Sequence, residues 1–478
     1  MKKIIAIIVA AAVVIGAAVT TVILVSKNGS SAGTSQSESL EKNESTGSGE
    51  SVSTSESEST NESKKPVEPD EPVEPVEDEF RQPQEEIDSF KEEIGGCSDT
   101  YEGALSETEY DDAENAAKDY VKYEVVGTEK AGEISDVKTK DLKLSDAEKL
   151  GINAGMLEGA TGIKECTVTY TEKAADVAKV SASEQPELSL LSETAVNKTT
   201  KVYIICFGGY YKYFSPALKT GETITKSYFD SIFNASKYDN CTVEYSAVTK
   251  TSLRVSADVM KDLPADQLPD DYEGGDYESV MTETRINQFV QYTENAIYYK
   301  QTLGMTDPET GKMKETKVEL YFEKNASAEL GFDFYAKNGA TWAKYTDITA
   351  LGFESIDDLR PFHQQYIDYS YFTKTEFGCA IQKENLEIYM NSAIQALKEM
   401  SKAMGAQSDD LDITVHVNKG YLNYFVKEGT LSGVKSCFEC SVPFNFNGMA
   451  TDIVVYTDGT TKCFDYGTTE ITRPEGIA

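Results

Sequence analysis

The stretch KVELYFEKNASAELGFDFYA, residues 317–336, decides the fold of the second half of the chain. Apolar residues alternate with charged or polar ones up to Phe322, and they alternate again up to Phe334. Successive side chains of a strand point to opposite faces of the sheet, so this pattern is typical of strands with one buried face. The stretch therefore predicts two half-buried strands.

The same kind of pattern extends over residues 241–478. Before the stretch come CTVEYSAV, TSLRVSADV and RINQFVQYTENAIYY; after it come LDITVHV, YLNYFVKEG, VKSCFECSVPFNF and ATDIVVY. Asn447-Gly448 and Asp458-Gly459 predict two-residue hairpin turns. Helices are expected over 355–372 and 384–405. This region is predicted to be a curved antiparallel sheet with helices.

Three segments make this second region resemble the lipoprotein-localisation (LolA/LppX-like) family. They are NGATWAKYTD (338–347), ITVHVNKGYLNYFVK (413–427) and FDYGTTEITRP (464–474). The resemblance implies an open half-barrel that holds acyl chains. The ligand-binding residues that it leads us to expect are Phe322, Phe332, Phe334 and Trp342.

A separate domain is expected over residues 85–240. SETEYDDAENAAKDYVKYEVVG has a capping-box signal at Ser106 and Glu109 and then an apolar face at helical spacing. A weaker helix (145–160), the strands KECTVTYTEK and TTKVYIICFGGYYKYFSP, and a helix over 225–236 follow. This order resembles the nuclear-transport-factor-2-like (SnoaL-like, cystatin-like) cone fold found in many Gram-positive bacterial surface proteins. That fold hosts both enzymes and binding modules, so it implies no function by itself.

The N-terminus predicts a membrane segment. Residues 4–25 carry no charge, and a helix of that length can cross a bilayer. Lys2 and Lys3 favour an N-terminus inside the cell. We expect a signal-anchor over 1–26, a single-pass protein of the cell membrane, and an extracellular body. Cleavage near Gly16-Ala17-Ala18 is the alternative.

A spacer is expected between the membrane segment and the body. Residues 27–84 are rich in Ser, Glu and Pro and contain little that could be buried, which predicts disorder. A modified low-complexity tail is the alternative reading. The net charge of −36 argues against a nucleic-acid partner.

Few residues in the sequence indicate catalysis or metal binding. His416 is expected to be an exposed histidine of a strand and His363 to have a structural role in a helix, and no metal site or cofactor is predicted. The pair Cys437 and Cys440 lies in a predicted strand, which points the two sulfurs to opposite faces. Cys166 and Cys206 are the best candidates for a disulfide, and free buried thiols are the alternative.

Together these patterns predict an α+β protein with an N-terminal transmembrane helix, a disordered spacer (27–84), a cone-like α+β domain (85–240) and a curved half-barrel (241–478). The function expected first is that of a membrane-anchored, extracytoplasmic, non-catalytic protein that holds a hydrophobic or lipid-like ligand. One alternative is an adhesion or assembly module with a self-filled core, which binds a cell-surface protein or wall component through exposed faces. A weaker one is a SnoaL-like enzyme, which would need an Asp or Glu with a raised pKa in the cone.

Overall fold

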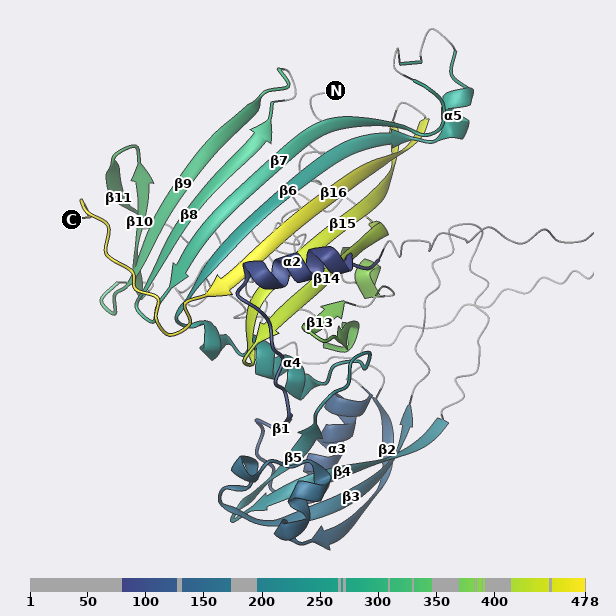
Figure 1. The fold of residues 1–478 in the computed structure, drawn as a ribbon, viewed down its shortest axis with the longest axis vertical. Coiled ribbons are helices and arrows are strands. Elements are labelled where there is room, and N and C mark those ends of the chain that lie inside the picture. Colours follow the sequence, from purple (N-terminus) through teal and green to yellow (C-terminus); the bar gives the residue numbers. More distant parts are fainter. Residues whose placement is uncertain are drawn as a thin grey trace, which may run out of the picture. The chain divides into compact units, whose positions relative to one another are not determined.

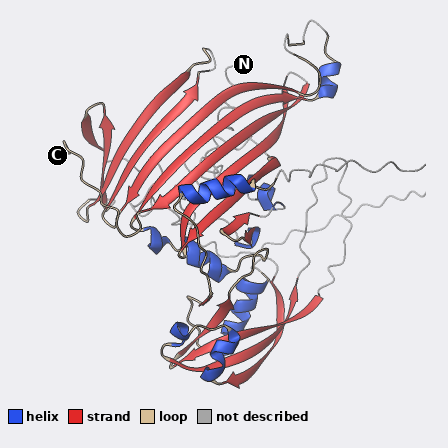
Figure 2. Ribbon diagram, in the orientation of Figure 1, coloured by secondary structure: helices blue, strands red, loops and turns tan. Residues whose placement is uncertain are grey.

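A computed structural model describes most of the chain beyond residue 79. The described residues belong to one compact unit. Strands make up 53% and helices 20% of the structure, and the strands form two antiparallel sheets (Figure 2). The described ranges are 80–126, 131–172, 196–264, 268–269, 272–307, 310–328, 331–345, 369–381, 383, 385–388, 390–391, 414–446 and 449–477.

The fold class expected from the sequence is wrong, because the protein is mostly antiparallel sheet rather than α+β. The predicted membrane segment, residues 4–25, lies outside the described residues. Within those residues no helix is both long and apolar enough to cross a membrane. This finding contradicts the expected signal-anchor and the single-pass localisation. The division into domains at residues 240 and 241 stays a prediction.

The larger sheet has eleven strands in the described residues, in the order β11-β10-β9-β8-β7-β6-β16-β15-β14-β13-β12 (Figure 1). Strands adjacent in sequence pair into two meanders, which join where β16 pairs with β6. The bounds are β6 Cys241–Val255, β7 Tyr277–Tyr292, β8 Ala296–Thr306, β9 Met313–Lys324, β10 Phe332–Asn338, β11 Thr341–Tyr345, β12 Phe372–Lys374, β13 Gly378–Ile381, β14 His416–Lys427, β15 Thr430–Phe446 and β16 Met449–Phe464.

The two faces of this sheet differ, as the alternation predicted. One face, here called the core face, carries Val243 and Tyr245 and contributes to the main hydrophobic core. The other, the outer face, carries residues such as Glu244 that alternate with them and are exposed. In β9 and β10, Phe322 pairs with Phe334, and both lie on the core face. The strand prediction for this stretch is confirmed.

A helix that the sequence did not predict lies on the outer face. Helix α2, Gln84–Glu93, crosses β14 and β15 (Figure 1). The Phe90 ring meets Phe425 edge-on, with centroids 4.9 Å apart. A Cβ on Gly433 would come within 2.9 Å of the Phe90 ring, so a glycine at this position lets the helix approach the sheet.

The smaller sheet has five strands in the described residues, in the order β1-β5-β4-β3-β2. Helix α3, Ala113–Tyr120, packs on it through Ala116 and Ala117, which are fully buried. The helix runs on as a π-helix, η1, Val121–Val125. Helix α4, Lys226–Phe233, then contributes to the main core under the larger sheet. The strand bounds are β1 Gly103–Leu105, β2 Ala131–Leu142, β3 Ala160–Glu172, β4 Val196–Phe207 and β5 Tyr210–Pro216.

A buried ion pair ties three separate segments together. Lys374 Nζ of β12 lies 2.8 Å from Asp99 Oδ2, and the two side chains are 9% and 3% exposed. The Tyr228 hydroxyl of α4 donates a hydrogen bond to the same carboxylate. This triad joins the segment that precedes the smaller sheet to an edge of the larger one.

Two local predictions are wrong. Ser106 does not cap a helix: it is buried, and α3 begins later with Asp112 as its N-cap, whose Oδ1 accepts a hydrogen bond from the Asn115 backbone N–H at 2.8 Å. Asp458-Gly459 is no turn, because both residues lie inside β16. A Cβ on Gly459 would come within 2.9 Å of Ser436 Oγ, so a larger residue there would require the Ser436 side chain to move.

Candidate functional site

The three phenylalanines expected to line a ligand cavity do lie together. Phe322, Phe332 and Phe334 are 3%, 4% and 7% exposed. The Phe322 and Phe334 rings stack with their centroids 4.8 Å apart. All three belong to the main hydrophobic core. Their contacts are those of core residues that already pack against one another.

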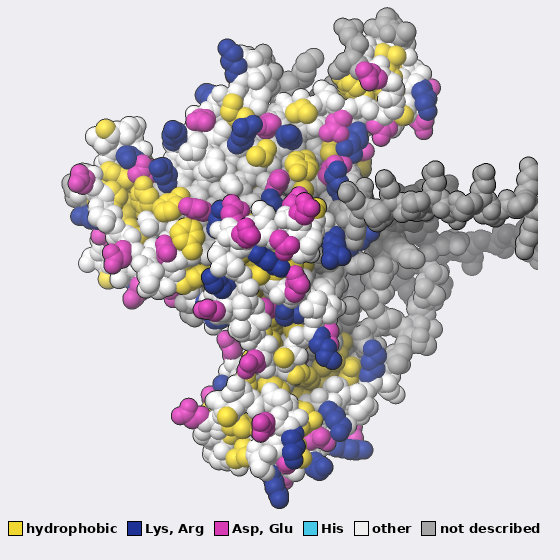
Figure 3. Space-filling view, viewed as in Figure 1, with side chains coloured by type: hydrophobic (Ala, Val, Ile, Leu, Met, Phe, Trp, Pro, Cys, Tyr) yellow, Lys and Arg dark blue, Asp and Glu magenta, His cyan; other side chains and the backbone are white. Residues whose placement is uncertain are grey.

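Trp342, the fourth expected ligand residue, lies on the opposite face of the sheet. It pairs with Lys337, whose Nζ is 5.6 Å from the centroid of the indole ring. It packs with Tyr335 in a cluster on the outer face, separate from the phenylalanines. Figure 3 shows this face, where hydrophobic side chains gather near β10 and β11. The structure therefore does not bring the four residues into one site.

The expected disulfide is not formed. Cys166 pairs with Val202 and Cys206 with Gly162, so the two cysteines are four residues out of register. Four residues along a strand span roughly 13 Å, whereas the Cα atoms of a disulfide lie within about 7 Å. Both cysteines are free, and burial raises the pKa of the Cys166 thiol to about 11.

The other candidate residues from the sequence are two cysteines, Cys437 and Cys440, and two histidines, His363 and His416. Cys440 is buried in the main core, while Cys437 points to the outer face, as expected for neighbours three apart in a strand. His416 is half-exposed beside Glu387, and His363 lies outside the described residues. Within the described ranges no group of three or more His, Cys, Asp or Glu side chains is arranged to hold a metal ion.

A groove lies on the outer face, across four neighbouring strands of the larger sheet. It has a cavity volume of about 550 Å³, within the usual range for small-molecule sites. The residues that line it come from β6, β7, β8 and β16; they are Glu244, Tyr245, Ser246, Asn287, Gln288, Phe289, Tyr298, Lys300, Thr302, Thr460 and Lys462. We call this the outer groove.

Strand register arranges the floor of the outer groove in two rows. The first row runs Lys462, Glu244, Phe289 and Lys300 from β16 to β8. The second row, two residues along each strand, is Thr460, Ser246, Asn287 and Thr302. Neighbouring strands are about 4.8 Å apart, so each row is roughly 14 Å long. An aromatic ring and charged groups thus lie beside a row of hydroxyl and amide groups.

Neighbouring ion pairs hold both ends of the groove. At one end Lys462 Nζ lies 2.8 Å from Glu93 Oε1 of α2. At the other end the Tyr298 hydroxyl and Lys337 Nζ each donate to Glu319 at 2.8 Å. Partial burial alone would raise the pKa of Glu319, but these hydrogen bonds outweigh it and lower that pKa. The Tyr298 ring is therefore fixed at the rim.

Two charged groups in the first row have no such partner. Among the described residues, neither the Glu244 carboxylate nor the Lys300 ammonium forms a hydrogen bond or an ion pair within 4 Å. They lie on either side of Phe289, two strand spacings or roughly 10 Å apart. Lys300 is opposite Glu319 on β9, and its charge helps to lower the pKa of that carboxyl group. Exposed charges that form no short contact, on either side of an aromatic ring, can bond to a polar ligand without first breaking a hydrogen bond or ion pair within the protein.

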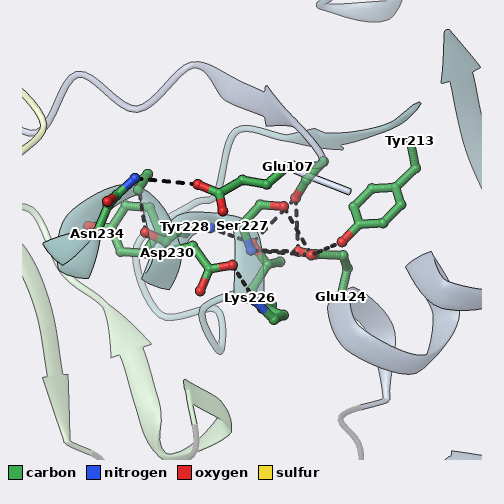
Figure 4. Close-up of polar contacts among 11 residues, drawn as sticks. Glu107, Glu124, Tyr213, Lys226, Ser227, Tyr228, Asp230 and Asn234 are labelled. Carbon is green, nitrogen blue, oxygen red and sulfur yellow. Dashed lines mark hydrogen bonds and ion pairs between the residues drawn. The ribbon is translucent and has the colours of Figure 1, made fainter. Parts of the chain in front are cut away.

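A second polar cluster surrounds Glu124 of the π-helix (Figure 4). Its carboxylate accepts hydrogen bonds from the Tyr213 hydroxyl at 2.8 Å, from Ser215 Oγ at 3.2 Å, and from both the backbone N–H and Oγ of Ser227. Ser227 is in the first turn of α4, where a helix favours a negative charge. The carboxylate already has four donors, so this arrangement favours a structural role that anchors α4 to the smaller sheet.

Comparison with known proteins gives no relative from which a site could be carried over: no family model matches the chain, and no curated protein matches it.

Sequence reasoning missed the outer groove for a physical reason. Lys462, Glu244, Phe289 and Lys300 come from four strands, and β16 meets β6 only through long-range pairing. Taken singly, each of these residues fits an ordinary solvent-facing position of a strand. The usable signal was Phe289, an aromatic residue at a position where the alternation predicts a polar one.

Proposed function

We propose that this protein is a non-catalytic binding module whose site is the outer groove. The main support is the composition of the groove floor: an accessible aromatic ring, two exposed charges that form no described hydrogen bond or ion pair, and a row of hydroxyl and amide groups, all on paired strands of one sheet. Paired strands fix the backbone beneath these groups, so binding has to order the side chains but not the backbone.

The groove fits a hydrophilic ligand better than the lipid-like one expected from the sequence. An acyl chain there would remove water from Glu244, Asn287 and Lys300 without replacing their hydrogen bonds, which is unfavourable. An acyl chain at the three phenylalanines would have to displace stacked, buried rings. The proposal therefore agrees with the alternative expected from the sequence, in which the protein binds its partner through an exposed face.

The test is a binding screen with the full-length chain. The panel contains short oligosaccharides, peptides, nucleotides and fatty acids, and binding is measured by native mass spectrometry and calorimetry. Loss of one charge-assisted hydrogen bond is worth about 1.5–3 kcal/mol, so Lys300→Ala should weaken binding of a hydrophilic ligand roughly tenfold or more.

The control is Lys250→Ala, which removes another exposed lysine from the outer face of β6, outside the groove lining. It should bind as the unaltered protein does. Binding of fatty acids that neither substitution changes would contradict the proposal and favour a hydrophobic site elsewhere.

A further inference from the structure

We infer that the ligand of the outer groove is a carbohydrate chain, with Phe289 as the platform on which one sugar ring stacks. This inference rests on the proposed function of the groove and names the class of ligand that it binds. The C–H groups on a sugar ring face carry small positive charges, and the face of an aromatic ring is negative, so the two attract each other when stacked.

The groups around Phe289 match the hydroxyls at the edge of such a ring. Glu244 is next to it on one side and Lys300 on the other. A carboxylate accepts hydrogen bonds from hydroxyls and an ammonium donates to them, and such charge-assisted bonds are about twice as strong as neutral ones. Because the two charges are opposite, the pair suits a ligand that is neutral but rich in groups that both donate and accept.

The second row extends the match beyond one ring. Ser246, Asn287 and Thr302 present two hydroxyls and an amide in a line parallel to the first row. Within the described part of the chain their side chains make no hydrogen bond. Tyr298, its hydroxyl bound to Glu319, gives a second aromatic ring at the rim. The floor can therefore contact neighbouring rings of a chain.

Other classes of polymer fit less well. A peptide that adds as a strand needs an unpaired strand edge, but β16, β6, β7 and β8 are each paired on both sides. A nucleic acid would approach a protein with a net charge of −36. A carbohydrate needs neither a free strand edge nor a basic surface.

The groove is built to bind sugars and not to cleave them. Glu244 is the single carboxylate among the residues that line it. Glycosidases generally use two carboxyl groups, roughly 5–10 Å apart, on either side of the bond that they break. The expected activity is retention of the polysaccharide without release of sugar.

The test uses the full-length chain and soluble gluco-, xylo- and N-acetylglucosamine oligosaccharides, with calorimetry as the readout. Phe289→Ala should weaken binding about tenfold, because stacking on an aromatic side chain is worth roughly 1–3 kcal/mol where it has been measured for nucleobases. Phe289→Trp should keep or strengthen binding. Tyr345→Ala removes an exposed ring from β11 and should change nothing.

Two other results would overturn the inference in different ways. If a peptide or nucleotide binds and Phe289→Ala abolishes that binding, while no oligosaccharide binds, the groove is a binding site but its ligand is not a carbohydrate. If an oligosaccharide binds equally to all three variants, the carbohydrate site lies elsewhere and the proposed role of the outer groove fails as well. Circular dichroism of each variant confirms that it is folded.

Discussion

The buried ion pair between Asp99 and Lys374 gives the sharpest stability prediction. Asp99→Asn keeps an acceptor for the Tyr228 hydroxyl but removes the negative charge. Lys374, with a side chain only 9% exposed, would then be a buried charge without its counter-ion. Breaking a buried pair in this way costs about 3–5 kcal/mol. We expect a loss of that size in the free energy of unfolding.

The double variant separates the charge effect from lost packing. Adding Lys374→Met to Asp99→Asn removes both charges and keeps most of the volume, and such replacements are often close to neutral. We therefore expect the double variant to regain most of the lost stability. The exposed pair Asp258 and Lys261, whose side chains are 94% and 69% exposed, is the control: Asp258→Asn should leave stability unchanged within error.

Urea unfolding is the assay, followed by far-ultraviolet circular dichroism and by the fluorescence of Trp342, the single tryptophan of the chain. Trp342 is on the edge strand β11, so coincidence of the two transitions tests whether unfolding is cooperative across the sheet. A loss below about 1 kcal/mol for Asp99→Asn would show that the charge of Asp99 does not stabilise the buried Lys374 ammonium. So would a double variant no more stable than the single one.

Two further predictions concern the larger sheet. Because hydrogen bonds lower the folded-state pKa of Glu319, its stabilising contribution is present above the unfolded-state pKa of about 4.3 and is lost as the pH falls through the folded-state value. Glu319→Gln should therefore lower the urea midpoint at about pH 7, with a gap that closes below about pH 4; a gap independent of pH would contradict this. Gly433→Ala should cost about 1–3 kcal/mol in urea unfolding, because its Cβ meets the Phe90 ring and the Thr461 carbonyl. Gly162→Ala, where a Cβ meets nothing within 4 Å, is the matched control, and an equal loss in both would rule out the contact with α2 as the cause.

The sequence was informative where structure is local. Alternation in residues 317–336 placed Phe322 and Phe334 on one buried face, and the structure confirms this because a half-buried strand needs that pattern. The sequence was misleading where a residue pair typical of tight turns occurs inside a strand. Asp458-Gly459 has the composition of a tight turn, yet both residues lie inside β16, where they pair with Cys437 and Ser436 of β15.

The candidate site could not be predicted because it depends on long-range register. Glu244 and Lys462 face each other only because β16 pairs with β6 across more than two hundred residues of sequence. The resemblance to half-barrel carriers pointed instead to the phenylalanines and to Trp342. Trp342 lies apart from the phenylalanines because side chains alternate between the two faces of a strand. The register of β10 with β11 puts Trp342 opposite Lys337, on the face away from Phe334.

Hydroxyl-radical footprinting of the full-length chain, with and without the oligosaccharide that binds best, shows whether the ligand occupies the outer groove. We expect the oxidation of Phe289 and Tyr298 to fall when the ligand is added, while that of Tyr345, an exposed ring outside the groove, does not change. Saturated binding with undiminished oxidation of Phe289 and Tyr298 would show that the ligand is held elsewhere and that the outer groove is not the site.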